Sequence, residues 1–360
     1  MTITDQIIYD VAVIGAGPAG AVFAKELAKA TQSKKILVIH KAQPKVCGGL
    51  LSPDAQKILA RLDLTLPKSI LADPQVFTVE TIDLSYKHTR FYPRHYLNMD
   101  RTAFDSWLLS LALAQKNVDI YEGNCFAIKK SSELIIIKVK NKDKESAFYT
   151  RTLVGADGAS SIVRKTFFSD RMYRYTAIQQ WFAAPNKNIH PYSCIFDKET
   201  TPSCSWTIKK EGIFIYGGAF PSNKCKRSFD EQKKRFEKKA SYSLGTPMKT
   251  EACLLSSPQK SSDFLTCKGN VFLIGEAAGF ISASSFEGIS YALLSAKILA
   301  DAFVNGKDNC IIRKIYKRKT LFLRLKLSLK ILKKHILYSP FLRRIIMLIG
   351  IGSIKKYNNI

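Results

Sequence analysis

Residues 7–20, IIYDVAVIGAGPAG, decide the fold of this 360-residue chain. The run from Ile7 to Ile14 is rich in β-branched residues and has the length of a buried strand. A glycine-rich turn follows directly, and residues 21–30, AVFAKELAKA, have helical character. Strand, glycine turn and helix in this order predict a Rossmann-type unit that binds a dinucleotide.

The turn has the GxGxxG pattern, and its members are the first cofactor-binding candidates: Gly15, Ala16, Gly17, Pro18, Ala19 and Gly20. We expect Gly15 to allow the tight turn, Gly17 to let a pyrophosphate approach the backbone, and Gly20 to let the helix pack on the sheet. The helix N-terminus then presents free N–H groups and a positive dipole end to the phosphates.

A second strand, residues 35–39 (KILVI), leads to the position where such a site usually has an acidic residue for the ribose hydroxyls. Here that position is His40, followed by Lys41. A neutral imidazole nitrogen accepts one hydrogen bond, so we expect these two residues beside the ribose in an altered site. The alternative is that His40 is a surface residue at a strand end.

Two later segments repeat the order of apolar strand, sharp turn and acidic residue. Residues 153–164 read LVGADGASSIVR and carry Asp157 and Gly158. Residues 271–292 read VFLIGEAAGFISASSFEGISYA and carry Gly275, Glu276, Gly279, Phe280, Gly288 and Ile289. Ligands gather at the carboxyl ends of strands in doubly wound sheets. We expect the carboxylates to accept hydrogen bonds from cofactor hydroxyls, and a helix opening after Gly279 to hold a polarised carbonyl.

GAGPAG, GADGASSIVR and GEAAGF, in this order and spacing, resemble the three fingerprints of p-hydroxybenzoate-hydroxylase-type flavoproteins. The resemblance implies FAD, and an α/β fold in which a Rossmann-type FAD-binding domain accompanies an antiparallel-sheet substrate domain. Glu276 stands where the class usually has Asp. The class also places an arginine against the FAD phosphates or ribityl chain, a contact that a guanidinium suits. Arg101 occupies the corresponding position in this chain. The alternative is a surface arginine at a helix start.

Residues 45–49 (KVCGG), 282–292 (SASSFEGISYA) and 338–344 (YSPFLRR) resemble elements of the geranylgeranyl-reductase family. That branch implies an isoprenoid-like substrate and places Cys47, Gly48 and Gly49 beside the flavin ring. Cys47 would donate a proton or tune the flavin, and an inert buried thiol is the alternative. Of the family's Y-x-W-x-F-P motif this chain keeps Trp206, which is a substrate-side candidate or a core aromatic.

These positions divide the chain into three parts. The FAD-binding domain is predicted to be discontinuous, over residues 1–72, 97–168 and 263–305. The substrate domain takes residues 73–96 and 169–262, whose strand-like runs would roof the flavin. Residues 306–360 form a basic helical C-terminal segment.

The charge of the chain is unusual, with 56 Lys and Arg against 29 Asp and Glu and a net charge of +27. Residues 301–360 hold 15 Lys or Arg and two Asp, a net charge of +13. Apolar residues recur there at helical spacing, so we expect residues 311–354 to lie on an anionic membrane surface. The alternative is a helical cap that closes the substrate cavity. The basic residues alternate with aliphatic rather than aromatic ones, which disfavours nucleic acid.

Eight scattered cysteines without a CxxC pair indicate free thiols in a reducing compartment and no metal site. No signal peptide or spanning segment is evident, so we expect a cytoplasmic protein, peripheral on the inner face of the membrane if the basic segment binds lipid. The favoured activity is hydride transfer from reduced FAD to a carbon–carbon double bond of an apolar substrate, with electrons from NAD(P)H or a ferredoxin. A monooxygenase acting through a flavin hydroperoxide is the alternative, because the fold supports both.

Overall fold

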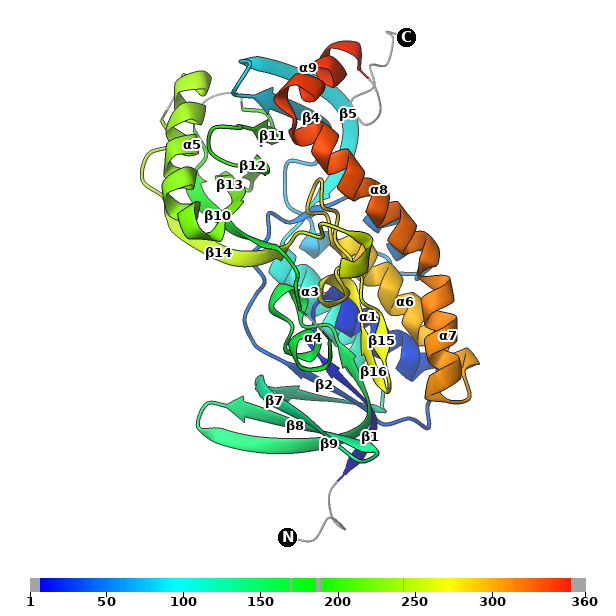
Figure 1. Cartoon of the computed structure of the whole chain (residues 1–360). Coiled ribbons are helices and arrows are strands. Elements are labelled where there is room, and N and C mark those ends of the chain that lie inside the picture. Colours follow the sequence, from blue (N-terminus) through cyan, green and yellow to red (C-terminus); the bar gives the residue numbers. More distant parts are fainter. Residues whose placement is uncertain (1–6, 169, 186–188, 242, 351–360) are drawn as a thin grey trace.

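The computed structural model describes residues 7–168, 170–185, 189–241 and 243–350. Two large sheets lie one beyond the other along the molecule, and the helices of the C-terminal segment run along one side from the first sheet to the second (Figure 1). The predicted fold class is confirmed: a Rossmann-type α/β unit, a mostly antiparallel second sheet and a helical C-terminal segment.

The first sheet is built around β1 (Ile8–Ile14), which pairs in parallel with β2 and β9. The strand order is β15 (Cys267–Lys268), β16 (Val271–Leu273), β9 (Lys144–Gly155), β1, β2 (Ile36–His40) and β6 (Val118–Glu122). The antiparallel strands β7 (Asn124–Ser131) and β8 (Leu134–Asn141) extend it from β9. The carboxyl ends of β1, β2 and β9 therefore meet at one edge of the sheet. The glycine turn follows β1 there, His40 ends β2, and the turn with Asp157 follows β9.

Strand β1 is buried on both faces, as a central parallel strand should be. On one face Val11 and Val13 pack with α1 (Pro18–Ala30), α2 (Pro53–Arg61), α3 (Arg101–Leu113) and α6 (Ile289–Asn305). On the other face Ala12 and Ile14 pack with β7, β8 and the short helix α4 (Ile162–Phe167). The apolar run that predicted a buried strand is thus explained by two separate cores.

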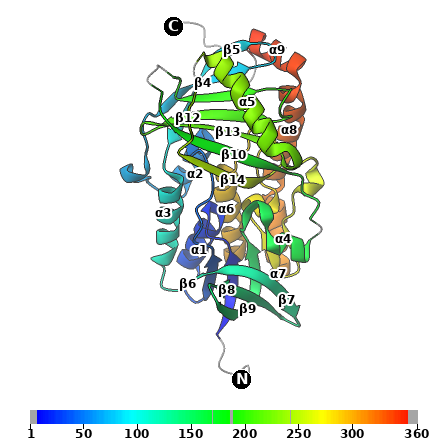
Figure 2. The ribbon, with the colours of Figure 1, turned by 90° about the vertical axis from the view of Figure 1, so that its left-hand side faces the viewer.

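The second sheet has the order β14 (Lys249–Ser256), β10 (Arg174–Ala183), β13 (Ile213–Pro221), β12 (Cys204–Lys210), β11 (Tyr192–Phe196), β4 (Val76–Asp83), β5 (His88–Asn98) and β3 (Leu50–Leu51). Its pairs are antiparallel except for β11 with β4. Helix α5 (Cys225–Ala240) crosses one face (Figure 2) and buries Phe229 and Phe236 against Tyr216 and Phe220. The opposite face is left for the site.

The C-terminal segment forms α7 (Asn309–Lys319), α8 (Leu321–Tyr338) and α9 (Pro340–Ile349). The chain bends at Thr320, so the apolar residues expected at helical spacing in this segment lie on separate helices. Thr320 is fully buried and its hydroxyl donates to the Tyr316 carbonyl at 2.7 Å. Pro340 then ends α8 and starts α9, since proline fits the first turn of a helix. Residues 351–354 of the segment expected on a membrane surface lie outside the described residues.

One face of α8 and α9 is packed on the protein and another is exposed. Leu323, Leu327 and Ile331 are buried, whereas Phe322 is 78% and Leu329 67% exposed. Along the described part of the chain, none of the helices combines the length and the apolar character needed to cross a bilayer.

Candidate functional site

A cavity of about 1060 Å³ lies between the two sheets and the C-terminal helices. It begins at the carboxyl ends of β1, β2 and β9 and reaches Leu337 of α8 and Ile346 of α9. Residues from distant segments meet there, and the sequence-predicted ones that line it are Gly15, Ala16, Gly17, Pro18, Ala19, His40, Lys41, Cys47, Gly48, Gly49, Arg101, Asp157, Gly158, Trp206, Glu276, Gly288 and Ile289.

The glycine turn at the start of α1 has the shape that a pyrophosphate needs. Gly17 caps α1 and Pro18 is its first residue. A Cβ placed on Gly17 or on Gly158 would meet no protein atom within 4 Å among the described residues. Both glycines therefore border open space in the cavity, so a phosphate can approach the backbone closely and use the N–H groups of the helix start. The residues present fit FAD.

The other two glycines of the turn act within the protein. Gly15 has φ +103°, and a Cβ there would overlap the carbonyl of Ala156, the residue directly after β9. A Cβ on Gly20 would overlap the Gly15 carbonyl. Gly20 does not line the cavity, and its part is the close packing of α1 on the turn.

His40 closes β2 and lines the cavity, so it is not merely a surface residue. Its Nδ1 lies 3.2 Å from the Lys41 carbonyl oxygen. Because a carbonyl only accepts, Nδ1 carries the proton when this bond forms, which leaves Nε2 as an acceptor. In that tautomer Nε2 is an acceptor, which is the hydrogen-bonding capacity that the sequence analysis expected of His40.

Asp157 lines the cavity, but its carboxylate accepts hydrogen bonds from the turn that follows it in the chain. One oxygen accepts from the Ser161 hydroxyl and the other from the Ile162 backbone N–H at 2.7 Å. Burial raises the pKa of Asp157, and these hydrogen bonds act against the rise. Asp157 thus fixes the turn before α4 and leaves Gly158 facing the cavity.

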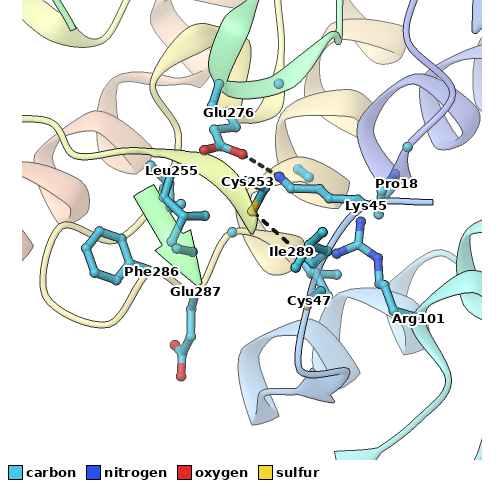
Figure 3. Close-up of a pocket in the computed structure, with 18 of the residues that line it drawn as sticks. Pro18, Lys45, Cys47, Arg101, Cys253, Leu255, Glu276, Phe286, Glu287 and Ile289 are labelled. Carbon is cyan, nitrogen blue, oxygen red and sulfur yellow. Dashed lines mark hydrogen bonds and ion pairs between the residues drawn. The ribbon is translucent and has the colours of Figure 1, made fainter. Parts of the chain in front are cut away.

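Glu276 links two of the sequence motifs. One carboxylate oxygen pairs with the Lys45 ammonium and the other accepts from the Ser256 backbone N–H at 2.9 Å (Figure 3). Burial opposes the charge on Lys45, but Glu276 outweighs it and the pKa of Lys45 is raised. The acidic residue expected to contact the cofactor also anchors the Lys45–Gly49 loop.

The helix expected directly after Gly279 is absent from the described residues, and this prediction is wrong. Gly275 and Gly279 belong to a tight turn, both with positive φ, and Phe280 is fully buried against Phe264. None of the three lines the cavity. Helix α6 begins later, with Gly288 at its cap and Ile289 as its first residue. The N-terminus of α6, and not the turn at Gly279, therefore faces the cavity and offers its N–H groups to a polarised carbonyl.

Cys47 lies beside Arg101 in the cavity wall (Figure 3). Burial opposes the thiolate, but Arg101 and the Gly49 backbone N–H stabilise it and the pKa of Cys47 is lowered. The Arg101 side chain is 9% exposed and forms two hydrogen bonds to Asp105, each 2.9 Å. Arg101 is therefore not the surface residue of the alternative reading.

Sequence reasoning missed Lys210, which holds the same loop from the second sheet. Its ammonium donates to the Gly48 carbonyl at 2.9 Å and to the Met99 carbonyl. Burial lowers the pKa of Lys210. The lysine is an ordinary residue at the end of a strand, so no local pattern identifies it.

Trp206 lines the cavity from β12 and also packs on the second sheet. Its indole nitrogen is buried above Gly217, where a Cβ would come within 2.6 Å. Among the described residues this N–H has no acceptor. Trp206 therefore packs in the second sheet, as a core aromatic would, and also lines the cavity, as a substrate-side residue would.

Arg164, at the end of the second motif, was not singled out from the sequence either. Its guanidinium donates to the Ala277 carbonyl at 3.0 Å and to the Asp263 carbonyl at 2.9 Å. It therefore fastens the second motif to the third.

A family described as "FAD binding domain" matches residues 8–302. Protein CbrA of Escherichia coli (strain K12) is 42% identical over 355 residues, covering 96% of this chain and 98% of that protein. Protein CbrA of Shigella dysenteriae serotype 1 (strain Sd197) is 43% identical, with the same two coverages.

Solved structures share the fold at low identity. A geranylgeranyl bacteriochlorophyll reductase-like protein from Thermoplasma acidophilum has a TM-score of 0.79 and 18% identity, over 97% of this chain and 93% of that one. The probable FAD-dependent monooxygenase pqsL from Pseudomonas aeruginosa has a TM-score of 0.69 and 16% identity, over 95% and 99%. At such identities the likeness shows the fold alone.

Proposed function

The chain belongs to the FAD binding domain family of flavin-dependent enzymes, and we propose that it reduces carbon–carbon double bonds of an apolar, isoprenoid-like substrate. One observation carries the proposal. The cavity that is lined by the motif glycines is also lined by apolar side chains of the second sheet and the C-terminal helices.

The apolar part of the cavity suits a long hydrocarbon chain, because burying such a surface away from water is favourable. Its walls come from β11, β12, β14, the loop before α6, α8 and α9, and the apolar side chains are Phe196, Ile208, Leu255, Ile281, Phe286, Leu337 and Ile346.

Reduction of a double bond requires a hydride on one carbon and a proton on the other. Reduced FAD supplies the hydride when bound, and its electrons come from NAD(P)H or a ferredoxin. Cys47 is the proton donor in this proposal. A general acid works best when its pKa lies near the working pH, and Arg101 shifts the thiol in that direction.

The choice of a reductase over a monooxygenase is supported by KVCGG at residues 45–49 and by the run at 282–292. The reductase-like structure of Thermoplasma acidophilum is consistent with it, although that likeness shows only the fold. Of the Y-x-W-x-F-P motif of the reductases, this chain keeps only Trp206. The isoprenoid chain of its substrate therefore need not match the chain that those reductases take.

The substrate is taken, in this proposal, from an anionic membrane that contacts the outer face of α7, α8 and α9. Residues 309–350 contain no Asp or Glu. Apolar side chains exposed on α8 and α9 include Phe322, Leu325, Leu329, Leu332, Phe341, Leu348 and Ile349, and α7 adds exposed Lys317, Arg318 and Lys319. An apolar face flanked by basic residues suits the headgroup boundary of acidic lipid.

Anaerobic reoxidation of the reduced flavin tests the activity. The flavin of the purified protein is reduced, a polyprenyl lipid is added without oxygen, and the absorbance of oxidised flavin is followed. The matched control is the saturated lipid of equal length, which has no double bond to reduce. Reoxidation by the unsaturated lipid alone supports the reductase. Reoxidation that requires oxygen and accompanies hydroxylation of the lipid would establish the monooxygenase instead.

A further inference from the structure

Two cysteine side chains from distant parts of the chain meet in the cavity wall. Cys47 belongs to the loop of residues 45–49, and Cys253 belongs to β14. Both are free thiols, and Figure 3 shows them in the same region of the cavity. The Cys253 thiol donates to the Val46 carbonyl at 3.7 Å. A carbonyl oxygen lies about 2.8 Å from the next Cα of a trans peptide, so the Cys253 Sγ lies within about 6.5 Å of the Cys47 Cα.

Contacts on both sides of Cys47 hold its loop in place. The Lys45 ammonium pairs with Glu276, whose other carboxylate oxygen accepts from a backbone N–H of β14. On the other side, the Lys210 ammonium donates to the Gly48 carbonyl at 2.9 Å. The two thiols therefore stay neighbours. Disulfide partners have Cα atoms about 4.4–6.8 Å apart. Rotation of the two side chains and a small shift of this glycine-containing loop would bring the sulfur atoms to bonding distance.

The two thiols differ in their surroundings. Burial opposes the thiolate of Cys47, but Arg101 and the Gly49 N–H, which donates to the sulfur at 3.4 Å, stabilise it and the pKa of Cys47 is lowered. Burial raises the pKa of Cys253 to about 11. Since the thiolate is the nucleophile, Cys47 is the thiol that attacks an electrophile, and Cys253 stands beside it as a protonated thiol.

The same cavity is lined by the motif glycines that fit FAD. A reduced flavin bound there releases hydrogen peroxide when it meets oxygen. The peroxide then forms in the cavity that both thiols line. Hydrogen peroxide is an electrophile toward thiolates, so Cys47 is the residue that it should oxidise first.

We propose that Cys47 and Cys253 form a peroxide-reactive pair, in which hydrogen peroxide oxidises Cys47 and Cys253 resolves the product as a disulfide. The Cys47 sulfur attacks one peroxide oxygen, the O–O bond breaks, and the departing hydroxide takes up a proton as water. The Cys253 sulfur then displaces the hydroxyl of the Cys47 sulfenic acid, which leaves with the Cys253 proton as a second water. In total, two thiols lose two electrons and two protons, and one peroxide becomes two waters.

The disulfide has two consequences for the site. Cys47 has no proton to donate while the disulfide stands, and its sulfur is kept from irreversible oxidation to the sulfinic acid. Reduction of the disulfide restores both thiols. The pair needs neither a lipid nor a hydride, so this chemistry goes beyond the proposed reduction of a double bond.

Peroxide treatment of the purified, FAD-loaded protein in its oxidised state tests the pair without lipid. Remaining thiols are alkylated before unfolding, and peptide mass spectrometry gives the state of each cysteine. We expect a disulfide that joins Cys47 to Cys253 and that dithiothreitol reverses. Cys310 of α7, which is exposed, is the internal reference, and Cys47 should be oxidised faster. Cys47 that remains a thiol, joins a different cysteine or reacts no faster than Cys310 would overturn the proposal.

Matched variants test the order of the two steps. Cys253→Ser should let Cys47 accumulate as a sulfenic acid that dimedone traps, and Cys47→Ser should leave Cys253 a free thiol. Cys204→Ser removes another thiol of the cavity wall and should leave the disulfide unchanged. A Cys253→Ser protein without trapped sulfenic acid, or oxidised Cys253 in Cys47→Ser, contradicts the assigned roles. Because the wild-type disulfide forms without lipid, failure of the reductase activity would leave this result intact.

Discussion

The Lys45 ammonium and the Glu276 carboxylate form an ion pair although 231 positions separate the two residues in sequence. Lys45 opens the KVCGG loop, and Glu276 stands in the third fingerprint beside α6. The pair therefore connects the loop that carries Cys47 to the turn that follows β16. Each motif was recognised separately in the sequence, and the ion pair shows that the fold brings the two into contact.

Replacing Glu276 tests that connection. Glu276→Ala removes the charge that holds Lys45 and the acceptor of the Ser256 N–H, so FAD retention should fall while the chain stays folded. Hydrogen bonds to charged groups contribute about 1.5–3 kcal/mol each. Flavin content after extensive dialysis measures the effect. Asp301→Asn, which breaks an exposed ion pair with Lys297, is the control. Full flavin occupancy in Glu276→Ala would show that this contact does not support the cofactor.

Two glycines of the first turn should respond differently to alanine. Gly17→Ala meets no protein atom and should leave the unfolding temperature of the FAD-free protein nearly unchanged, yet abolish FAD binding, because the new methyl group occupies the approach to the pyrophosphate. Gly15→Ala should destabilise the protein itself, since Gly15 has φ +103° and borders the Ala156 carbonyl. Thermal unfolding and flavin release separate the two effects. A Gly17→Ala protein that retains FAD would place the pyrophosphate elsewhere.

Cys47 should react with iodoacetamide at lower pH than Cys253. Arg101 lowers the pKa of Cys47, whereas burial raises the pKa of Cys253 to about 11. Only the thiolate is nucleophilic, so the alkylation rate rises with pH through each pKa. Arg101→Gln should move the Cys47 profile to higher pH and leave Cys253 much less affected. Peptide mass spectrometry follows both sites, and an unmoved Cys47 profile would show that Arg101 does not tune the thiol.

The same lowered pKa has a consequence for turnover. If the Cys47 thiol donates the proton, reductase activity is present below its pKa and is lost as the pH rises through it, which begins below the ordinary thiol range. Cys47→Ser should lower the rate and remove this alkaline limb. An alkaline limb that persists in Cys47→Ser would assign the proton to another group.

Liposome co-sedimentation tests the outer face of the C-terminal helices. Binding should require acidic lipid and weaken with salt, because the Debye length is about 8 Å at physiological ionic strength. Changing Lys317, Arg318 and Lys319 to Glu should reduce it, at about 1 kcal/mol for each basic residue, and Phe322→Asp should reduce it at any salt concentration. The control changes Lys234, Lys238 and Lys239 of α5 to Glu, the same charge on another exposed surface. If the wild-type protein does not bind acidic liposomes at low salt, the membrane proposal is wrong and the alternative, a helical cap that closes the substrate cavity, is favoured.

The sequence predicted the first sheet well because its motifs are local. A strand, its turn glycine and the helix that follows are neighbours in the chain, so Gly15, Gly17 and Gly158 were correctly placed at strand ends. The helix start after Gly279 was wrong because residues 282–288 are rich in serine and form a loop before the apolar run of α6. Gly288, directly before that run, was the better indication of the start.

The rest of the site depends on contacts between distant segments. Lys210 of β12 donates to the Gly48 carbonyl, and Arg94 of β5 pairs with the Glu287 carboxylate at 3.1 Å. Both are polar residues on strands, and only the fold brings their partners near. Helical spacing also did not tell which lysines of the basic segment face outward. Lys334, for example, is buried and donates to Gln259 at 3.0 Å.

The central claim is that this enzyme adds hydrogen to a double bond. The most direct test is the mass of the product after a single anaerobic turnover of the reduced, FAD-loaded protein with an unsaturated polyprenyl lipid. The account predicts a product that has gained two hydrogens, formed in proportion to the flavin oxidised. Unchanged substrate without oxygen, with an oxygen atom gained when air is admitted, would contradict it and identify a monooxygenase.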